Sequence, residues 1–245
     1  GNSWSLTAHS CLSCPPGGVS EPDSVGVLSC TASKGHVGQP GGPFQPCPVG
    51  SYKEVEGQGE CQPCSDRSST EQAASTQAAN CRALPGSYGA DGGPFAECGP
   101  GTYSDRMGQE ECTPCPDGST SQGRGATSMQ PCIALPGWTH ATSWDVGPFV
   151  RCDKGTYKAV SGPAGCKACP ECSTTTKVGA TAAKECVADQ GCEGKGFGWE
   201  IGFAMCPLGT WKNWVGNGQC DPCPADVDMR LPAAKTCRPA HAAEE

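Results

Sequence analysis

The sequence predicts a small disulfide-rich fold, made mostly of short β-hairpins and loops and repeated in tandem as an elongated array without a conventional core. Three observations predict it. The 245 residues include 21 cysteines, 35 glycines and 23 prolines, and the cysteines recur at fixed spacings. Leu, Ile, Val and Phe make up only about 11% of the chain, below the fifth expected around an apolar core. Cross-links therefore have to replace burial, because a disulfide closing a loop of about 15 residues removes roughly 3 kcal/mol of unfolded-chain entropy.

The cysteines divide the chain into repeats. Three sets of four have successive separations of 14, 3 and 17 positions, and a last set has 14, 3 and 14. A period of this kind indicates stacked structural units. The sets are Cys47, Cys61, Cys64 and Cys81; Cys98, Cys112, Cys115 and Cys132; Cys152, Cys166, Cys169 and Cys186; and Cys206, Cys220, Cys223 and Cys237. We predict repeats at 33–83, 84–134, 135–188 (with an extra cysteine) and 189–245.

Residues 1–32 are predicted to form a partial repeat. Cys11, Cys14 and Cys30 fit the second, third and fourth positions of a set, and the first position would precede Gly1. Cys11 is therefore expected to be unpaired, or bonded outside the chain, and we expect the natural protein or a covalent partner to continue upstream. Since the chain starts at Gly1 rather than Met, a signal peptide or anchor is expected outside it.

The residues between the cysteines predict a hairpin in each full repeat. A glycine suits a turn at positive φ, and a following Ser or Thr with an aromatic residue favours a strand. These segments are Gly50-Ser51-Tyr52, Gly101-Thr102-Tyr103, Gly155-Thr156-Tyr157 and Gly209-Thr210-Trp211. A second glycine, four residues before the second cysteine, suits the return turn. The Ser/Thr-rich segment after the third cysteine predicts turns and short strands.

Aromatic residues mark two of the boundaries between repeats. Tyr88 and Trp138 follow Ala83-Leu84-Pro85-Gly86 and Ala134-Leu135-Pro136-Gly137. They are predicted to seal the junctions, because a thin repeat cannot bury such a ring alone. The alternative is incidental packing of an exposed ring.

The repeats resemble the ephrin-receptor-like repeat, which is related to tumour-necrosis-factor-receptor modules. The motif is complete between Cys98 and Cys132, where Gly101-Thr102-Tyr103, Cys112-Thr113-Pro114-Cys115-Pro116, Gly118-Ser119-Thr120 and Gly125-Ala126-Thr127 follow one another. The resemblance implies β-hairpin modules strung end to end in the ectodomains of large surface or matrix proteins. It also implies bonds from the first cysteine to the second and from the third to the fourth, whereas spacing alone allows three pairings.

Applied to this chain, the resemblance implies nine pairs, and two further cysteines remain to bridge each other. The nine pairs are Cys14 with Cys30, Cys47 with Cys61, Cys64 with Cys81, Cys98 with Cys112, Cys115 with Cys132, Cys152 with Cys166, Cys169 with Cys186, Cys206 with Cys220, and Cys223 with Cys237. The remaining two are Cys172 and Cys192. An exchange of partners between Cys169 and Cys172 is the alternative.

The sequence offers no catalytic residues, metal ligands or cofactor motif that we can identify. Zinc is the rival interpretation of Cys-x-x-Cys, but zinc sites usually combine two such pairs, and each regular set has one. A redox role for Cys169 and Cys172 lacks the βαβ context. The four histidines, His9, His36, His140 and His241, have no partner spacing and are predicted to lie in exposed loops. We predict a protein that is not an enzyme, with no cofactor.

Charge and modification motifs narrow the partners. The net charge of −8 is spread thinly along the chain, and there is no run of Lys and Arg that would bind nucleic acid. No apolar stretch is long enough to span a membrane. The expected partners are other extracellular proteins or further copies of this chain. No N-glycosylation sequon occurs, Ser/Thr clusters are candidate O-glycan sites, and Trp211-x-x-Trp214 marks Trp211 as a candidate for C-mannosylation.

These observations predict an extracellular or cell-surface location, since disulfides persist outside the reducing cytosol. The predicted function is a stalk or subunit of a cell-surface or filamentous assembly, for which the ciliary surface is one setting. The alternative is the ligand-binding ectodomain of a receptor, with the segment 195–199 near the extra cysteines as the place to seek a partner.

Overall fold

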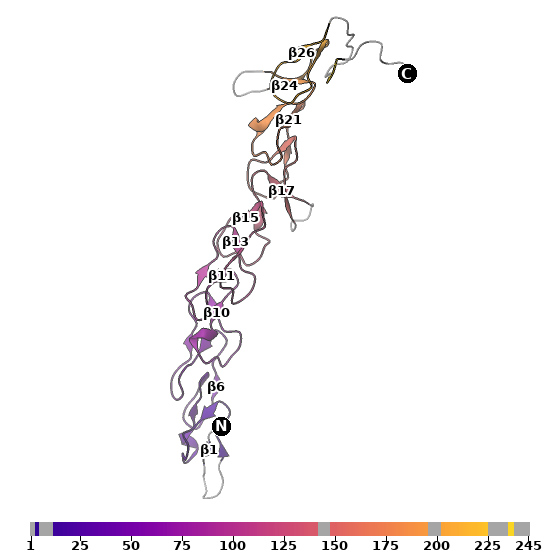
Figure 1. The fold of residues 1–245 in the computed structure, drawn as a ribbon. Coiled ribbons are helices and arrows are strands. Elements are labelled where there is room, and N and C mark those ends of the chain that lie inside the picture. Colours follow the sequence, from indigo (N-terminus) through magenta and orange to yellow (C-terminus); the bar gives the residue numbers. More distant parts are fainter. Residues whose placement is uncertain (1–2, 5–11, 142–147, 196–201, 225–234, 238–245) are drawn as a thin grey trace, which may run out of the picture. The chain divides into compact units, whose positions relative to one another are not determined.

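The structure is a computed structural model that describes residues 3–4, 12–141, 148–195, 202–224 and 235–237. In this part of the chain every sheet is a single antiparallel pair of strands, each two to four residues long. The helical segments described are three short 3-10 turns, η1 (Val27–Ser29), η2 (Ala78–Asn80) and η3 (Ala183–Glu185). Figure 1 shows these short strand pairs linked by loops, which confirms the predicted fold class of tandem disulfide-rich hairpins.

Two successive strands in the chain form each pair. The pairs are β1 (Ser3–Trp4) with β2 (Leu12–Ser13), β3 (Gly18–Val19) with β4 (Thr31–Ala32), β5 (His36–Val37) with β6 (Gln45–Pro46), β7 (Ser51–Tyr52) with β8 (Gln62–Pro63), β9 (Ser68–Ser69) with β10 (Arg82–Ala83), β11 (Ser87–Tyr88) with β12 (Ala96–Glu97), β13 (Thr102–Tyr103) with β14 (Thr113–Pro114), β15 (Ser119–Ser121) with β16 (Cys132–Ala134), β17 (Trp138–His140) with β18 (Phe149–Arg151), β19 (Thr156–Tyr157) with β20 (Lys167–Ala168), β21 (Ser173–Thr175) with β22 (Cys186–Ala188), β23 (Cys192–Lys195) with β24 (Gly202–Met205), and β25 (Thr210–Trp211) with β26 (Asp221–Pro222).

The pairs follow the cysteine repeat. Each of the predicted repeats 33–83, 84–134 and 135–188 contains three strand pairs, and the middle pair carries the Gly-Ser/Thr-Tyr segment. The chain divides into two compact units, 1–115 with 121–131 and 116–120 with 132–245. The predicted repeat boundaries are not tested by this division and stay a prediction. Among the described residues, no helix is long and apolar enough to cross a membrane.

The buried apolar residues are small. Among the described residues they are cysteines and alanines, with Phe44 the one larger side chain. Phe44 packs with Cys30, Ala32 and Cys14, beside the disulfide that closes the partial repeat. Apolar burial of this size cannot hold a repeat together, because about 25 cal/mol is gained per Å² of apolar surface and alanines bury little.

Hydrogen bonds tie the two loops of each repeat together instead. A glycine N–H at the start of the middle hairpin donates to a buried hydroxyl twenty residues later. These bonds run from Gly50 to Thr70 Oγ1 (3.0 Å), from Gly101 to Ser121 Oγ (2.8 Å) and from Gly155 to Thr175 Oγ1 (3.1 Å). The Ser/Thr-rich segment is therefore an internal acceptor for the hairpin, since a buried N–H without a partner would be costly.

A side chain caps two of the 3-10 turns. Asn80 Oδ1 accepts the N–H groups of Thr76 and Gln77, both at 3.1 Å, ahead of η2. Glu185 accepts those of Thr181 (2.7 Å) and Ala182 (3.0 Å) ahead of η3. The hydrogen bond from the Thr181 backbone holds the pKa of Glu185 below its ordinary value, because it stabilises the carboxylate.

Candidate functional site: stapled hairpins and their junctions

Disulfides close both loops of each repeat. The structure joins Cys14–Cys30, Cys47–Cys61, Cys64–Cys81, Cys98–Cys112, Cys152–Cys166, Cys169–Cys186, Cys172–Cys192, Cys206–Cys220 and Cys223–Cys237. Cys115 and Cys132 are also disulfide-bonded. Cys11 lies outside the described residues, as does most of the segment 195–199. The Cys172–Cys192 bond differs from the others because it joins the predicted repeat 135–188 to the start of the next one.

A buried lysine fills the middle hairpin of three repeats. Lys53, Lys158 and Lys212 each follow the aromatic residue of that hairpin, and their exposed fractions are 2%, 4% and 0%. Burying an ammonium group is costly unless its N–H groups find acceptors. Backbone carbonyls of the same hairpin's return turn and, for Lys53 and Lys212, of the preceding strand pair supply those acceptors.

The ammonium groups donate to carbonyl oxygens. Lys53 Nζ lies 2.9 Å from the oxygen of His36 and 2.6 Å from that of Gly57. Lys158 Nζ lies 2.6 Å from the oxygen of Gly162, the glycine equivalent to Gly57. The first carbonyl belongs to the preceding strand pair and the second to the return turn, so one side chain connects both.

The last repeat has the same arrangement with an added ring. Lys212 Nζ donates to the oxygens of Cys192 (2.8 Å) and Gly216. It also lies 4.3 Å from the centre of the Trp214 ring, a cation–π distance. Trp211, the predicted modification site, is half-buried in β25. Nothing in the structure tests the C-mannosylation of Trp211, which stays a prediction.

Desolvation lowers the pKa of all three lysines. For Lys158 it is the one cause, whereas the carboxylates of Glu56 near Lys53, and of Asp189 and Glu193 near Lys212, oppose it. The lysines are held by carbonyl dipoles rather than by direct ion pairs. An amine of lowered pKa is a nucleophile in open sites, but these three side chains are at most 4% exposed and donate to backbone carbonyls.

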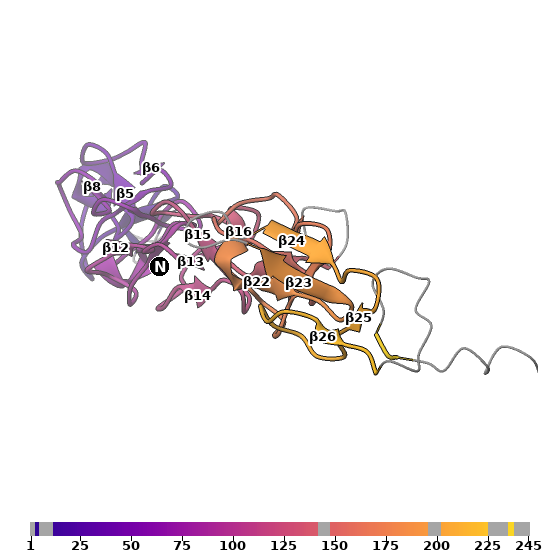
Figure 2. The same cartoon turned by 90° about the horizontal axis from the view of Figure 1, so that it is seen from above.

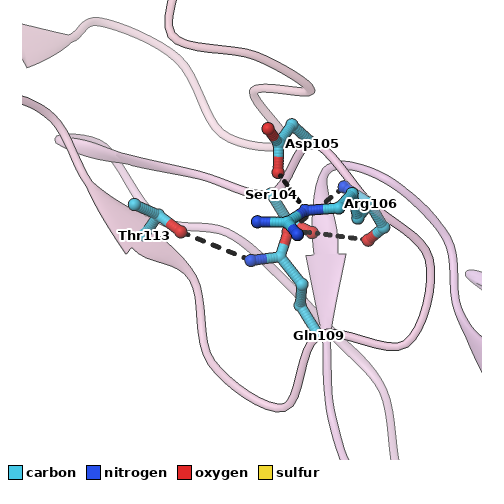
Figure 3. A network of polar contacts seen from close by, with 5 residues as sticks. All are labelled: Ser104, Asp105, Arg106, Gln109 and Thr113. Carbon is cyan, nitrogen blue, oxygen red and sulfur yellow. Dashed lines mark hydrogen bonds and ion pairs between the residues drawn. The ribbon is translucent and has the colours of Figure 1, made fainter.

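In the repeat 84–134 the interior of the middle hairpin is filled by polar side chains other than lysine. Ser104 takes the equivalent position and is fully buried. Figure 3 shows that Ser104 Oγ donates to Gln109 Oε1 (2.9 Å), which also accepts the N–H of Arg106 (3.2 Å), while Gln109 Nε2 donates to Thr113 Oγ1 (3.3 Å). A serine and a glutamine together occupy the interior that a lysine fills elsewhere.

The lysine and serine positions also join neighbouring repeats through their backbone. Lys158 N–H donates to the oxygen of Ala180 (3.0 Å) within its repeat, and its own oxygen accepts the N–H of Gly137 (2.9 Å) at the junction. Ser104 makes the equivalent bonds with Ala126 (2.9 Å) and Gly86 (2.8 Å). This one residue therefore connects the hairpin, the second loop and the preceding junction.

A buried alanine marks each junction. Its carbonyl accepts the N–H of the return-turn glycine in the following hairpin. The bonds run from Gly57 to Ala32 (2.7 Å), Gly108 to Ala83 (2.8 Å), Gly162 to Ala134 (3.0 Å) and Gly216 to Ala188 (2.8 Å). These alanines are at most 1% exposed, so a longer side chain would have no space.

Trp138 seals its junction, as predicted, and Tyr88 does not. The Trp138 ring lies directly over Gly118, where an added Cβ would be 2.2 Å from Cε3, and the Arg151 guanidinium lies 4.9 Å from the ring centre. Tyr88 is exposed at its edge of the repeat, which fits the alternative of incidental packing.

The histidine prediction is wrong for the two histidines described. His36 lies in β5 and His140 in β17, both half-buried, and His140 packs 4.6 Å from the Phe149 ring centre. Each of them belongs to the first strand pair of its repeat, and pairing with the partner strand leaves the side chain half-buried. Among the described residues, no cluster of three His, Cys, Asp or Glu side chains could hold a metal ion.

One polar hollow of about 200 Å³ lies between Glu71, Arg82 and Asp91. The Arg82 guanidinium is 2.6 Å from Glu71 and 3.3 Å from Asp91, and hydrogen bonds to these carboxylates raise its pKa. One guanidinium therefore pairs with two carboxylates at the surface, which leaves the three groups with a net negative charge.

The three buried lysines are not among the residues expected from the sequence, although the sequence carries a signal for them. Lys53, Lys158 and Lys212 occur at one position of the repeat, directly after an aromatic strand residue. A lysine that recurs at the same place in three cysteine frameworks can be suspected of a buried role. The Ser104–Gln109 replacement carries no comparable signal.

A family model described as "Tyrosine-protein kinase ephrin type A/B receptor-like" matches three segments, 42–81, 86–132 and 148–186. Together they cover about half of the chain, and each contains one regular four-cysteine set.

Several curated proteins are similar. The chain is 35% identical over 144 residues to the rat protein "Sushi, von Willebrand factor type A, EGF and pentraxin domain-containing protein 1", covering 57% of this chain and 4% of that protein. It is 34% identical over 122 residues to human "Signal peptide, CUB and EGF-like domain-containing protein 2", covering 46% and 12%. It is 31% identical over 139 residues to "Cysteine repeat modular protein A" of Toxoplasma gondii, covering 51% and 4%. The chain thus spans a small part of each relative.

Proposed function

This chain belongs to the ephrin-receptor-like repeat family, and from that premise we propose that it is a non-catalytic extracellular segment that spaces or connects other modules. In finer terms, it is a stalk or a subunit of a cell-surface or filamentous assembly, with the ciliary surface as one setting. Its partners are other extracellular proteins or further copies of the chain. The relatives support this reading by their names, which describe multi-domain proteins with CUB, EGF-like, sushi or repeated cysteine modules.

The proposal rests on the contacts of the lysine and arginine side chains, which bind other parts of the chain itself. Lys53, Lys158 and Lys212 are buried against backbone carbonyls. The surface arginine of the polar hollow is held by two carboxylates. Charged groups that a catalytic site would expose instead connect loops of the protein, and the same connections recur from repeat to repeat, as in an array that spaces other modules.

Immunogold labelling of intact, unpermeabilised cells of the source organism tests the location. An antibody raised against residues 33–188 should label the cell surface or surface filaments. Labelling that appears only after permeabilisation would contradict the proposal. Light scattering across a concentration series would then separate a self-associating subunit, whose mass rises with concentration, from a stalk, whose mass does not.

A receptor ectodomain that binds a soluble ligand is the second candidate. The last repeat favours it, because Met205, Leu208 and Trp214 are 60%, 63% and 43% exposed there. Exposed aromatic and large apolar side chains are common anchors of interfaces. A soluble protein that co-purifies at fixed stoichiometry, and is lost in Trp214→Ala but retained in Val160→Ala, would support this alternative over the stalk.

A further inference from the structure

The four junctions between successive repeats share one backbone geometry. Two positions meet there, which we call the junction pair: the residue three after the third cysteine, and the residue after the junction glycine. The pairs are Gly17 and His36, Arg67 and Ser87, Gly118 and Trp138, and Cys172 and Cys192. The first member is left-handed in every case, with φ of 79°, 65°, 80° and 66°.

The backbone bond beside the first member is also the same. Its carbonyl accepts the N–H of the residue two before the junction glycine. The bonds are Ser33 to Gly17 (2.8 Å), Leu84 to Arg67 (2.9 Å), Leu135 to Gly118 (2.9 Å) and Asp189 to Cys172 (3.1 Å). Three junctions keep this bond without a disulfide, so the geometry does not depend on one.

The side chains at the junction pair differ in kind. At two junctions a ring lies on a glycine: an added Cβ would be 2.5 Å from the ring of His36 at Gly17, and 2.2 Å from that of Trp138 at Gly118. At the last junction the pair is covalently joined, as Cys172–Cys192. This bond connects the turn residue directly before β21 to the first residue of β23 across the junction, where β22 and β23 lie side by side (Figure 2).

We propose that the Cys172–Cys192 disulfide is a redox-controlled lock on the junction between the repeats 135–188 and 189–245. A disulfide resists reduction to the extent that it stabilises the fold relative to the reduced chain. The bonds within a repeat replace its apolar core, so opening one removes much of the stability of that repeat. Opening the junction bond leaves the two within-repeat bonds on each side and the backbone contacts that the other junctions use.

The lock is opened by an extracellular dithiol. Its thiolate attacks the sulfur of Cys172, which is partly exposed, whereas Cys192 is 6% exposed. The Cys172–Cys192 bond breaks, Cys192 leaves as a thiolate and takes up a proton, and a mixed disulfide forms on Cys172. The second thiol of the reagent then displaces Cys172. The protein disulfide is reduced to two thiols and the dithiol is oxidised to its disulfide.

Opening the lock frees the junction while both repeats stay folded. Lys212 donates to the carbonyl of Cys192, so the disulfide also holds in place the strand that supplies an acceptor for this buried lysine. The amides of Asp189, Gly191 and Gly216, which bond across this junction, should exchange faster after reduction. The equivalent amides of Leu135, Gly137 and Gly162 should not change.

Stepwise reduction of the full chain tests the proposal. The folded protein is titrated with dithiothreitol, free thiols are trapped with N-ethylmaleimide, and unreduced peptides are mapped by mass spectrometry. Cys172 and Cys192 should be labelled first, at a dithiothreitol concentration about tenfold below that needed for any other pair. First labelling of a within-repeat pair, or simultaneous labelling of all pairs, would overturn the proposal.

A redesigned junction provides the matched control. Cys172→Gly with Cys192→Trp recreates the Gly118 and Trp138 pair at the last junction. In this variant, junction exchange should no longer respond to mild reductant, while it rises about tenfold or more in the unmodified protein. A response that persists in the variant would show that reduction acts elsewhere. Should the variant fail to fold, the labelling order in the unmodified chain still decides the question.

Discussion

The repeats 84–134 and 135–188 have the same framework and different interiors. Both have three strand pairs, a glycine bonded to a buried hydroxyl and an alanine at the junction, but the interior of the middle hairpin is filled by Ser104 with Gln109 in one and by Lys158 in the other. The framework therefore requires polar groups that satisfy the interior of the hairpin, and it accepts them from different residues. Disulfides and main-chain bonds define the repeat, and the polar filler adjusts its stability.

Removing the disulfide of the middle hairpin should have the largest effect, and an equal one in both repeats. Cys98→Ser with Cys112→Ser, and Cys152→Ser with Cys166→Ser, each open a loop with a sequence separation of 14. We expect each to lower the free energy of unfolding of its repeat by about 3 kcal/mol, as seen in native-state hydrogen exchange. A repeat that keeps its protection without this bond would show that the filler, not the disulfide, defines the framework.

Replacing the polar side chain that fills the middle hairpin, which we call the filler, should destabilise the two repeats by different amounts. Lys158→Met leaves the Gly162 carbonyl without its donor and should cost about 1–3 kcal/mol, whereas Ser104→Ala leaves Gln109 bonded to Arg106 and should cost about 0.5–1.5 kcal/mol. Chemical denaturation followed by hydrogen exchange of each repeat measures both. Lys154→Met, at an exposed position two residues after Cys152, is the control and should change stability by less than about 0.5 kcal/mol. An equal loss in the free energy of unfolding for Lys158→Met and Ser104→Ala would contradict the expected difference between the two repeats.

The repeat 84–134 should accept a lysine in place of Ser104 only if Gln109 is replaced at the same time. Ser104→Lys alone places an ammonium where Gln109 already lies and should cost about 1–3 kcal/mol through overpacking. Ser104→Lys with Gln109→Ala should recover most of this loss, because the Gly108 carbonyl is equivalent to that of Gly162. Thermal unfolding of the two variants compares them, and a double variant no better than the single one would show that the interiors are not interchangeable.

The smallest effect should be a pH dependence confined to the lysine repeats. Desolvation lowers the pKa of Lys158 in the folded state, so between that lowered value and 10.5 the unfolded chain binds more protons than the folded one. The stability contributed by Lys158 therefore rises as pH increases through this window. The stability difference between the unmodified chain and Lys158→Met should grow over the same range, with ¹⁵N NMR of the Lys158 ammonium locating the titration. A difference independent of pH would indicate that the lysine titrates at its ordinary value.

The sequence predicts the framework well because its signals are local. The glycines before Tyr52, Tyr103 and Tyr157 occupy positive φ, and the strands begin where the spacing predicts. The interior is harder, because burial of a lysine depends on carbonyls brought together by two loops and not on neighbours in the sequence. His140 shows the same limit: its strand partner Phe149 lies further along the chain, and no local pattern indicates that the two pair.

Disulfide mapping of the unreduced protein tests the central claim most directly. Proteolysis and mass spectrometry under acidic conditions should recover Cys152 with Cys166, Cys169 with Cys186, and Cys172 with Cys192, together with the corresponding pairs of the other repeats. Peptides that join Cys169 to Cys192 and Cys172 to Cys186 would instead start the one bond across the last junction from Cys169. That result would contradict the third-to-fourth pairing of the repeat 135–188 and the Cys172–Cys192 lock.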